Sequence, residues 1–179
     1  MLEQEVKLAF GDYEAARAAV TSAGARLVAS PRLQDDRLFD TRDGDIRARG
    51  CTLRIRREEG EAQLTFKGPV QPGPVKTREE TEIGVSDAAQ LETILAALGL
   101  TPWFRYQKRR ETYLLDNAKV EIDQTPIGVY VEIEGPPDAI HRIAAALERT
   151  PADYVLDSYR SLYAKWCERK GIASSEMVF

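Results

Sequence analysis

The 179-residue chain is 43% hydrophobic and carries a formal net charge of −4 at pH 7. Such a chain can bury one core, so we expect residues 1–179 to form a single domain, and its charge gives no general attraction to nucleic acid or to an anionic membrane. No apolar run reaches the roughly 18 residues of a membrane span, and two isolated cysteines make neither a disulfide framework nor a zinc site. We therefore expect a cytoplasmic protein without nucleic-acid or membrane partners.

Charged and aliphatic residues alternate along the first segment, Leu2–Leu8. Because successive side chains of a strand point to opposite faces, Glu3, Glu5 and Lys7 share one face. A charged strand face is usually solvated, but here the pattern recurs. The further strands predicted from it are Leu53–Arg56, Gln63–Lys67, Arg78–Ile83, Lys108–Thr112, Val120–Asp123 and Val129–Glu134, with short ones near Leu33–Asp40 and Thr112–Asp116.

Four helices are predicted between and after the strands, from apolar residues at helical spacing. They are Tyr13–Ala23 after the capping residue Asp12, a segment between Asp87 and Gly99, one after Pro137, and one from Tyr159 to Gly171. Each helix has one apolar stripe that must be covered. The aliphatic strand faces can cover these stripes, which leaves the charged strand faces on the opposite side.

The charged faces can line an open, solvated sheet or the interior of a closed barrel. About eight strands close into a barrel that holds side chains or one small ligand, and closure removes exposed edge strands. We therefore predict an α+β fold, a closed eight-stranded antiparallel β-barrel tunnel with helices packed on its outside. The residues predicted to face inward are Glu3, Glu5, Glu80, Glu82, Asp123, Glu132, Glu134, Lys7, Arg54, Arg56, Lys67, Arg78, Lys108 and Arg110.

Ion pairing alone is a weak reason to fill a tunnel with charges, because desolvating them is unfavourable. Converging arginines and lysines suit a polyanion such as a chain of phosphates. Clustered carboxylates without histidine suit a hard cation, Mg²⁺ or Mn²⁺, which binds through a few carboxylates together with substrate phosphates. A metal ion with a triphosphate meets both demands, and a solvated charged sheet is the competing interpretation.

The same residues, in order, resemble the signature of the CYTH superfamily, the triphosphate tunnel metalloenzymes. That group includes class IV adenylyl cyclases, thiamine triphosphatases and inorganic triphosphatases. The resemblance is carried by Glu3-x-Glu5-x-Lys7, Phe39–Thr41, Leu53–Arg56, Leu64–Pro69, Lys76–Glu80, Lys108-x-Arg110, Asp123, Gly128 and Glu132–Glu134. The segments Lys67–Pro69 and Lys76–Glu80, with Ser158-Tyr159, are most similar to the class IV cyclase branch.

The resemblance implies a tunnel in which carboxylates hold a metal ion and basic residues hold a triphosphate such as tripolyphosphate or ATP. The expected metal ligands are Glu3, Glu5, Glu80, Glu82, Asp123, Glu132 and Glu134. The expected triphosphate-binding residues are Lys7, Arg54, Arg56, Lys67, Arg78, Lys108 and Arg110. We assign catalytic roles to Lys67, Glu5 and Glu134. Leu38 stands where many members have a tyrosine, which weighs against thiamine triphosphate as the substrate.

Two reactions fit this tunnel. Water can attack a terminal phosphorus, or a ribose hydroxyl can attack the α-phosphorus and release pyrophosphate. No base-reading motif is visible beyond the aromatic residues Trp103, Phe104 and Tyr106, which are more often core residues. We therefore place a metal-dependent triphosphatase, acting on an inorganic or nucleoside triphosphate, ahead of a class IV adenylyl cyclase. A non-catalytic module that binds polyphosphate or nucleotides is the third alternative, and a homodimer is compatible with each.

The remaining polar residues receive ordinary structural interpretations. Glu79, Arg109 and Glu111 alternate out of the tunnel and are expected to meet solvent, while Lys119 and Glu121 are left unassigned. Tyr159 fits the apolar stripe of the last helix, although together with Ser158 it could also cover the tunnel mouth.

Overall fold

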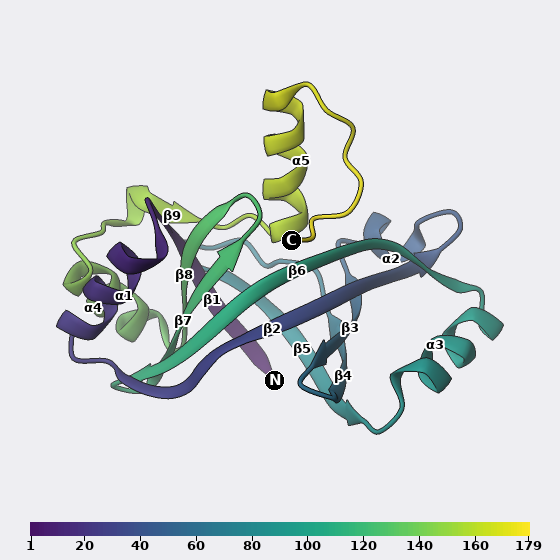
Figure 1. Cartoon of the computed structure of the whole chain (residues 1–179), viewed down its shortest axis with the longest axis horizontal. Helices are drawn as coiled ribbons and strands as arrows, with labels where there is room; N and C mark the ends of the chain where they lie inside the picture. Colours follow the sequence, from purple (N-terminus) through teal and green to yellow (C-terminus); the bar gives the residue numbers. More distant parts are fainter.

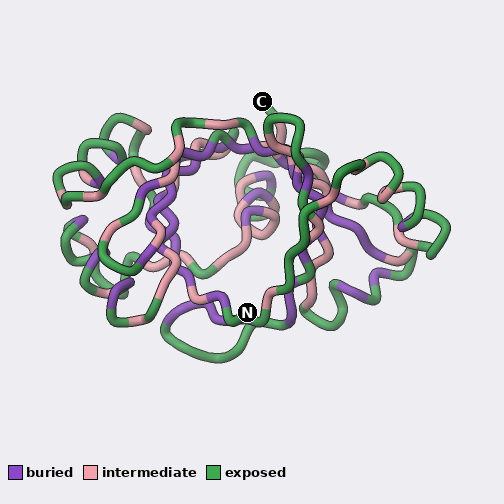
Figure 2. The backbone as a smooth tube through the Cα atoms, turned by 90° about the horizontal axis from the view of Figure 1, so that it is seen from below, coloured by how far each residue is buried: buried purple, intermediate pink, exposed green.

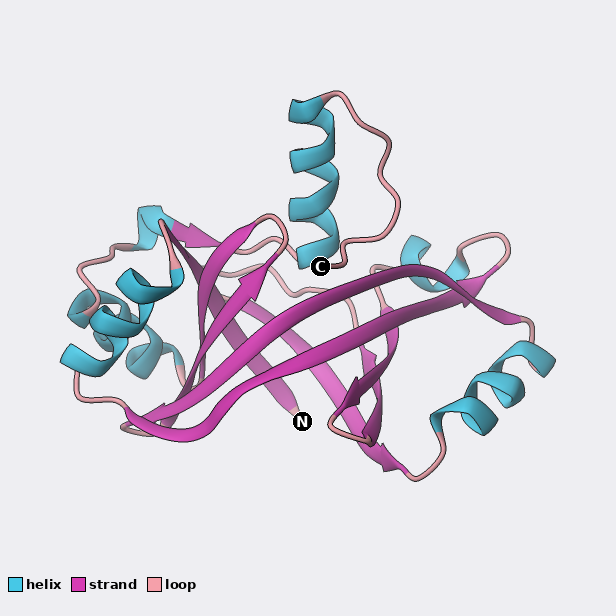
Figure 3. Cartoon of the chain, in the orientation of Figure 1, coloured by secondary structure: helices cyan, strands magenta, loops and turns pink.

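The computed structural model describes residues 1–179, which form nine strands and five α-helices (Figures 1 and 3). The strands are β1 (Leu2–Phe10), β2 (Arg26–Thr41), β3 (Thr52–Glu58), β4 (Glu61–Lys67), β5 (Lys76–Val85), β6 (Leu100–Leu115), β7 (Ala118–Thr125), β8 (Gly128–Glu134) and β9 (Tyr154–Val155). The helices are α1 (Tyr13–Ser22), α2 (Asp45–Ala48), α3 (Ala88–Ala97), α4 (Pro137–Ala146) and α5 (Tyr159–Lys170), with a 3₁₀ turn at Pro151–Asp153.

The first eight strands close into a ring. Their order is β5-β4-β3-β2-β6-β7-β8-β1, and β1 pairs back with β5. In that closing pair Leu2 lies opposite Glu79 and Glu5 lies opposite Lys76. Every pair in the ring is antiparallel, and the short β9 extends the sheet beside the second half of β1. The predicted closed eight-stranded antiparallel barrel is confirmed.

Two strands are much longer than their sequence pattern predicts. Strands β2 and β6 have 16 residues each, and the segments predicted as Lys108–Thr112 and Thr112–Asp116 are parts of the single strand β6. Three register shifts interrupt the pairing of β2 with β6. Such irregularities break the regular alternation of side chains, which explains why the period of two identifies only part of each strand.

The aliphatic faces of the strands point outward and pack under helices, as predicted. On one side Val6, Val131 and Ile133 of the barrel share a core with Val20 of α1 and Ile140 of α4. The other flank has a smaller core beneath α3. Each buried aliphatic side chain contributes about 1.5–3 kcal/mol relative to leaving it exposed. With the aliphatic faces buried in these two cores, the charged strand faces lie toward the barrel interior.

Glu111 is an exception on the outer face, and its predicted solvent exposure is wrong. Its side chain is only 2% exposed, and its Oε2 accepts a hydrogen bond of 2.7 Å from the hydroxyl of Tyr13 in α1. Arg17 of the same helix lies 3.7 Å from that oxygen. The carboxylate is therefore covered by α1 and satisfied there. Glu79 and Arg109, the other two residues predicted to point outward, are exposed.

The last helix lies in a different place from the other predicted helices. Helices α1, α3 and α4 pack on the outside of the barrel, whereas α5 lies across one of its openings (Figures 1 and 2). Its buried residues Tyr159 and Tyr163 join Leu38, Phe104 and Tyr106 in a third core. Helix α5 is thus also outside the barrel, but it covers an opening and not the side of the wall. None of the helices is both long and apolar enough to cross a membrane.

Candidate functional site

The inner faces of the strands enclose a cavity of about 1110 Å³. Only nine of its 39 lining residues are hydrophobic, so the interior is strongly polar. The cavity brings together the predicted residues Glu3, Glu5, Lys7, Arg54, Arg56, Lys67, Arg78, Glu80, Glu82, Lys108, Arg110, Glu132 and Glu134. The remaining predicted residue, Asp123, lies behind the cavity surface and is fully buried.

Lys67 joins two carboxylates on the side of the cavity where the barrel closes. Its Nζ lies 2.6 Å from Glu3 Oε1 and 2.7 Å from Glu80 Oε2. The second oxygen of Glu3 accepts a hydrogen bond of 3.2 Å from Arg78 Nε. These side chains come from β1, β4 and β5, so the pairing of β1 with β5 assembles the group.

Lys7 forms a second group of the same kind. Its Nζ lies 3.0 Å from Glu5 Oε1 and 3.1 Å from Glu132 Oε1. Burial disfavours the charge on Lys7, but the carboxylates of Glu132 and Glu5 outweigh it and raise the pKa of Lys7. Lys76 Nζ lies 2.6 Å from the same oxygen of Glu5, and burial together with the charge of Lys7 lowers the pKa of Lys76 to about 8.

Asp123, buried in the barrel wall, forms ion pairs with Lys108 and Arg110 of the cavity. Arg110 forms ion pairs with Asp123, Glu121 and Glu132, and Lys108 Nζ lies 2.8 Å from Asp123 Oδ2. Burial and the neighbouring charge of Arg110 lower the pKa of Lys108 to about 8. The carboxylate of Asp123 therefore fixes the bases in position and does not line the cavity itself.

Asp36 performs the same task for the two arginines of β3 and was missed at the sequence level. Arg56 Nε donates to Asp36 Oδ1 at 2.9 Å, and Arg54 Nε lies 3.4 Å from the same oxygen. Burial pushes the pKa of Asp36 upward, but the charges of Arg56 and Arg54 outweigh it and lower that pKa. The available signal was an acidic residue two positions before Leu38, on the strand face that also carries Gln34 and Leu38 of the cavity lining.

Several charged cavity residues were not assigned from the sequence, and three of them continue the pattern of the predicted residues. These three are Lys76, Lys119 and Glu121. Lys76 lies two positions before Arg78 in β5, and Glu121 and Lys119 lie two and four positions before Asp123 in β7. The alternation that predicted Arg78 and Asp123 therefore also places these three residues on the inner face. Lys119 Nζ lies 2.8 Å from Glu134 Oε2. Burial raises the pKa of Glu134, whereas neighbouring lysines and arginines lower the pKa values of Glu5, Asp36, Glu80 and Glu132.

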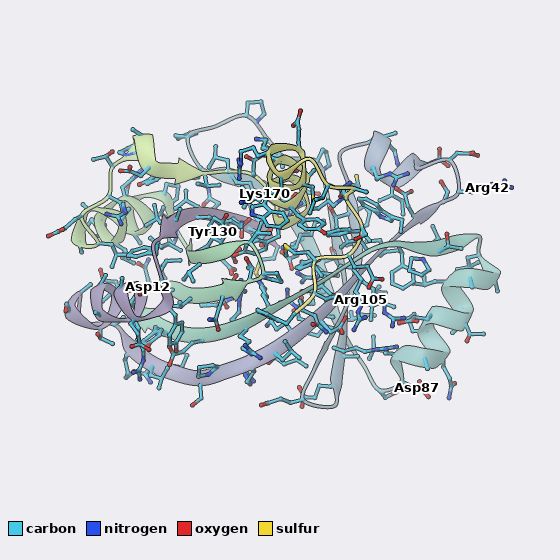
Figure 4. All side chains as sticks on the ribbon, turned by 45° about the horizontal axis from the view of Figure 1, so that its top comes forward. Asp12, Arg42, Asp87, Arg105, Tyr130 and Lys170 are labelled. Atoms are coloured by element: carbon cyan, nitrogen blue, oxygen red, sulfur yellow. The ribbon has the colours of Figure 1, made fainter.

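Tyr159 is one of the aromatic residues that line the cavity, with Trp103 and Tyr106, and it lies at the end covered by α5. Its ring packs edge-on against that of Tyr130, labelled in Figure 4, with 5.6 Å between centroids. The ammonium groups of Lys108 and Lys7 lie 4.9 and 5.3 Å from the centroid of the Tyr159 ring. Both interpretations of Tyr159 therefore hold, because it belongs to a core and also covers the cavity.

The carboxylates inside the barrel are the right kind of ligand for Mg²⁺ or Mn²⁺. No three acidic, histidine or cysteine side chains converge closely enough to hold a metal ion by themselves. They instead form pairs that share a lysine, Glu3 with Glu80 and Glu5 with Glu132. Mg²⁺ is commonly bound by one or two carboxylates, with substrate phosphates and water completing its shell. The residues present therefore fit a metal ion that binds together with a phosphate ligand.

The chain belongs to the CYTH family, since its residues 1–155 match the CYTH domain. Members of the family bind triphosphate substrates and are generally dependent on a metal ion. Over 135 residues the chain is 30% identical to "Putative adenylate cyclase MJ0240" of Methanocaldococcus jannaschii, covering 75% of this chain and 77% of that protein.

Solved structures have the same fold at low sequence identity. One is described as a "putative adenylate cyclase" from Vibrio parahaemolyticus, with a TM-score of 0.81, 15% identity and coverage of 92% of this chain and 98% of that one. Another is "Putative adenylyl cyclase HpAC1" from Hippeastrum, described as having "a dominant" triphosphatase activity. Its TM-score is 0.65 at 14% identity, and the match covers 97% of each chain. These likenesses establish the barrel fold.

Proposed function

We propose that this protein is a divalent-metal-dependent triphosphatase that binds the phosphates of an inorganic or nucleoside triphosphate inside the barrel. The observation that carries this proposal is the convergence of basic side chains from five strands on one cavity. They are Lys7 of β1, Arg54 and Arg56 of β3, Lys67 of β4, Lys76 and Arg78 of β5, and Lys108 and Arg110 of β6. A chain of phosphates is a ligand that can contact so many cations at once.

Arg54 can donate a hydrogen bond to a phosphate without losing its carboxylate partner. Asp36 holds Arg56 through two hydrogen bonds but only approaches Arg54, whose Nε is buried and makes no hydrogen bond. An unsatisfied buried N–H is unfavourable, and a phosphate oxygen would satisfy it. Arg54 is thus positioned by the charge of Asp36 and by a 3.0 Å hydrogen bond from its Nη2 to Thr65 Oγ1, and its Nε is left free to donate.

The carboxylate pairs Glu3 with Glu80 and Glu5 with Glu132 would hold the metal ion, with Glu82 and Glu134 in the same cavity. When bound, Mg²⁺ or Mn²⁺ neutralises charge on the phosphate oxygens and lowers the pKa of a bound water. Burial raises the pKa of Glu5, but the lysines around it, Lys7 first, outweigh burial and lower that pKa, so Glu5 stays ionised as such a ligand must.

The three proposed catalytic residues then have different tasks. Lys67 keeps its ammonium group between two carboxylates and would stabilise charge on the phosphate in the transition state. Glu5 orients Lys7 and Lys76. Glu134 has a raised pKa and holds Lys119 through Oε2, so its Oε1 is the atom that would take the proton of the attacking water. Water then cleaves the terminal anhydride and releases orthophosphate.

A class IV adenylyl cyclase is the second candidate function. It is favoured by the name of the Methanocaldococcus jannaschii relative, which is 30% identical to this chain. In that reaction the ribose 3′-hydroxyl attacks the α-phosphorus of ATP, and cyclic AMP and pyrophosphate leave in equal amounts. The same basic cavity would bind the triphosphate, so the products distinguish the two reactions.

The test is to incubate the protein separately with tripolyphosphate and with ATP, with Mg²⁺ or Mn²⁺, and to identify products by phosphorus NMR. Orthophosphate with pyrophosphate from the first, or with ADP from the second, supports hydrolysis. Cyclic AMP with an equal amount of pyrophosphate overturns it in favour of the cyclase. Tight binding of either triphosphate with no product after days overturns both and leaves a binding module.

A further inference from the structure

The end of the cavity covered by α5 is aromatic, and Trp103 is its most accessible ring. Trp103 lines the cavity half-buried and packs against Phe104, with 5.9 Å between ring centroids. Two guanidinium groups lie near the indole, that of Arg47 at 4.4 Å and that of Arg160 at 5.6 Å from the ring centroid. An aromatic ring that attracts planar guanidinium groups is also a surface on which a nucleobase stacks.

Arg160 differs from every other basic side chain of the cavity. Each other lysine or arginine that lines it forms a salt bridge with a carboxylate. Arg160 forms none, and its Nε is buried without a hydrogen-bond partner. Its guanidinium lies 5.0 Å from the ring centroid of Phe104, which holds it at this end of the cavity. Its N–H groups are therefore available to acceptor atoms of a ligand.

The opposite opening of the barrel is acidic and not aromatic. The turn between β3 and β4 lies away from α5 (Figure 1), and it is flanked by Glu58 and Glu61, which both line the cavity. Glu59 at the turn itself adds a third acidic residue, and Arg32, which pairs with Glu58 and Glu59, offsets only one of these three charges. Carboxylates repel phosphates, whereas an aromatic wall with a free guanidinium suits an uncharged, planar, hydrogen-bonding group. The asymmetry favours a ligand with phosphates in the middle and an aromatic group at the α5 end.

We propose that Trp103 and Arg160 form a nucleoside-binding subsite at the α5 end of the cavity, which makes a nucleoside triphosphate a better substrate than inorganic tripolyphosphate. This inference rests on the proposed function, because it requires the phosphates to occupy the basic interior. The base stacks on the indole in place of Arg47, whose side chain is 45% exposed and can move aside. Arg160 donates hydrogen bonds to acceptor atoms of the base.

The kinetic test compares ATP with tripolyphosphate as substrates of Trp103→Leu, Arg160→Gln and the control Trp166→Leu. Trp166 is the only other tryptophan; it lies on α5, stacks on Tyr163 and does not line the cavity. Loss of base stacking predicts that kcat/KM for ATP falls about 5- to 150-fold in the Trp103 variant, with tripolyphosphate changed less than about twofold. Arg160→Gln should likewise lower kcat/KM for ATP more than kcat/KM for tripolyphosphate. Trp166→Leu should leave both values unchanged. Equal losses with both substrates, or no loss, overturn the subsite.

A binding measurement keeps this inference separate from the proposed reaction. In Trp166→Phe, Trp103 is the single indole of the chain, so tryptophan fluorescence reports this position alone. With Mg²⁺ present, ATP should change the emission in a saturable manner and tripolyphosphate should not. A wild-type protein that turns over neither substrate would end the triphosphatase proposal, yet this titration would still decide the subsite. No response to ATP, or the same response to both ligands, overturns it.

Discussion

The hydroxyl of Tyr159 donates a hydrogen bond of 2.6 Å to Asp123 Oδ2, which joins the helix across the barrel opening to the barrel wall. The same oxygen accepts from Lys108 Nζ at 2.8 Å. Burial raises the pKa of Tyr159 well above its usual value and the charge of Asp123 raises it further, so the phenol keeps its proton and donates. One carboxylate thus fixes both α5 and a basic residue of the cavity.

Tyr159→Phe should destabilise the protein by about 1.5–3 kcal/mol, because the hydrogen bond to a buried carboxylate is lost while the ring beneath the lysines remains. Urea denaturation of both proteins measures the difference. The matched control is Tyr154→Phe, whose hydroxyl lies 2.8 Å from His141 Nδ1 outside the barrel and should contribute less, about 0.5–1.5 kcal/mol. A larger loss at Tyr154 than at Tyr159 would contradict the proposed anchoring role.

Arg54→Ala should weaken tripolyphosphate binding by about 2–5 kcal/mol, the usual effect of removing one partner of a buried charge pair. The fold should survive, because Arg56 still balances Asp36. Arg109→Ala is the control, since Arg109 is exposed on the outer face of β6 and stacks on Phe179. Isothermal titration calorimetry measures both. Equal losses in the two variants would mean that the cavity is not where the ligand binds.

Removal of divalent metal should abolish turnover, because the cavity carboxylates occur in pairs that can hold a hard cation only together with phosphates. The measurement is phosphate release before and after EDTA treatment and gel filtration. Added Mg²⁺ or Mn²⁺ should restore the rate. Undiminished activity in a sample shown to be metal-free by elemental analysis would rule out the metal requirement.

Mg²⁺ with tripolyphosphate should raise the melting temperature, because a ligand that binds only the folded state stabilises it by mass action. At a ligand concentration 100 times its Kd the expected gain is about 2.7 kcal/mol. Differential scanning calorimetry measures the shift, with Mg²⁺ alone and tripolyphosphate alone as controls. The full shift should need both components, and an unchanged melting temperature with both at saturation would count against a triphosphate site.

Asp36→Asn should destabilise the protein at pH 7 by about 3–5 kcal/mol, because it leaves the two buried arginines of β3 without their carboxylate. The folded pKa of Asp36 is lowered, so its stabilising contribution is present above its unfolded pKa of about 3.9 and is lost as the pH falls through the folded pKa. The gap between wild type and variant should therefore narrow in acid, as measured by urea denaturation at several pH values.

The control for this prediction is Asp116→Asn, at an exposed turn where the only ion pair is a 3.8 Å contact with Arg142. Exposed pairs of this kind contribute at most about 1 kcal/mol. Its stability should follow the wild type at every pH. A gap for Asp36→Asn that stays constant down to pH 2 would contradict the assigned ionisation.

Much of the fold and most of the cavity lining could be predicted from a period of two. Glu3, Glu5 and Lys7 share a face because strand geometry leaves no alternative, and the same rule selected thirteen of the cavity residues. The rule was stopped too early for Lys76 and Glu121, which continue the pattern by one more step toward the start of β5 and β7. Their omission was a failure of interpretation, since local geometry had already placed them.

Periodicity states which face a side chain is on, but not what covers that face. Glu111 was placed on the correct outer face and wrongly given to solvent, because nothing in its own strand indicates that Tyr13 and Arg17 of α1 lie over it. Helix α5 shows the same limit, since an apolar stripe requires burial without specifying where. Its aromatic residues are buried equally well on the side of a barrel or across its opening.

The sequence by itself determined the alternating faces, the helix starts at Asp12 and Asp87, and the charge of the interior, because each depends on residues within a few positions of one another. Tertiary structure alone decided which charges meet. Lys67 reaches Glu3 only because β1 pairs with β5, and Asp123 binds Tyr159 only because α5 covers the opening. Such pairings depend on barrel closure and helix docking, which bring together residues far apart along the chain.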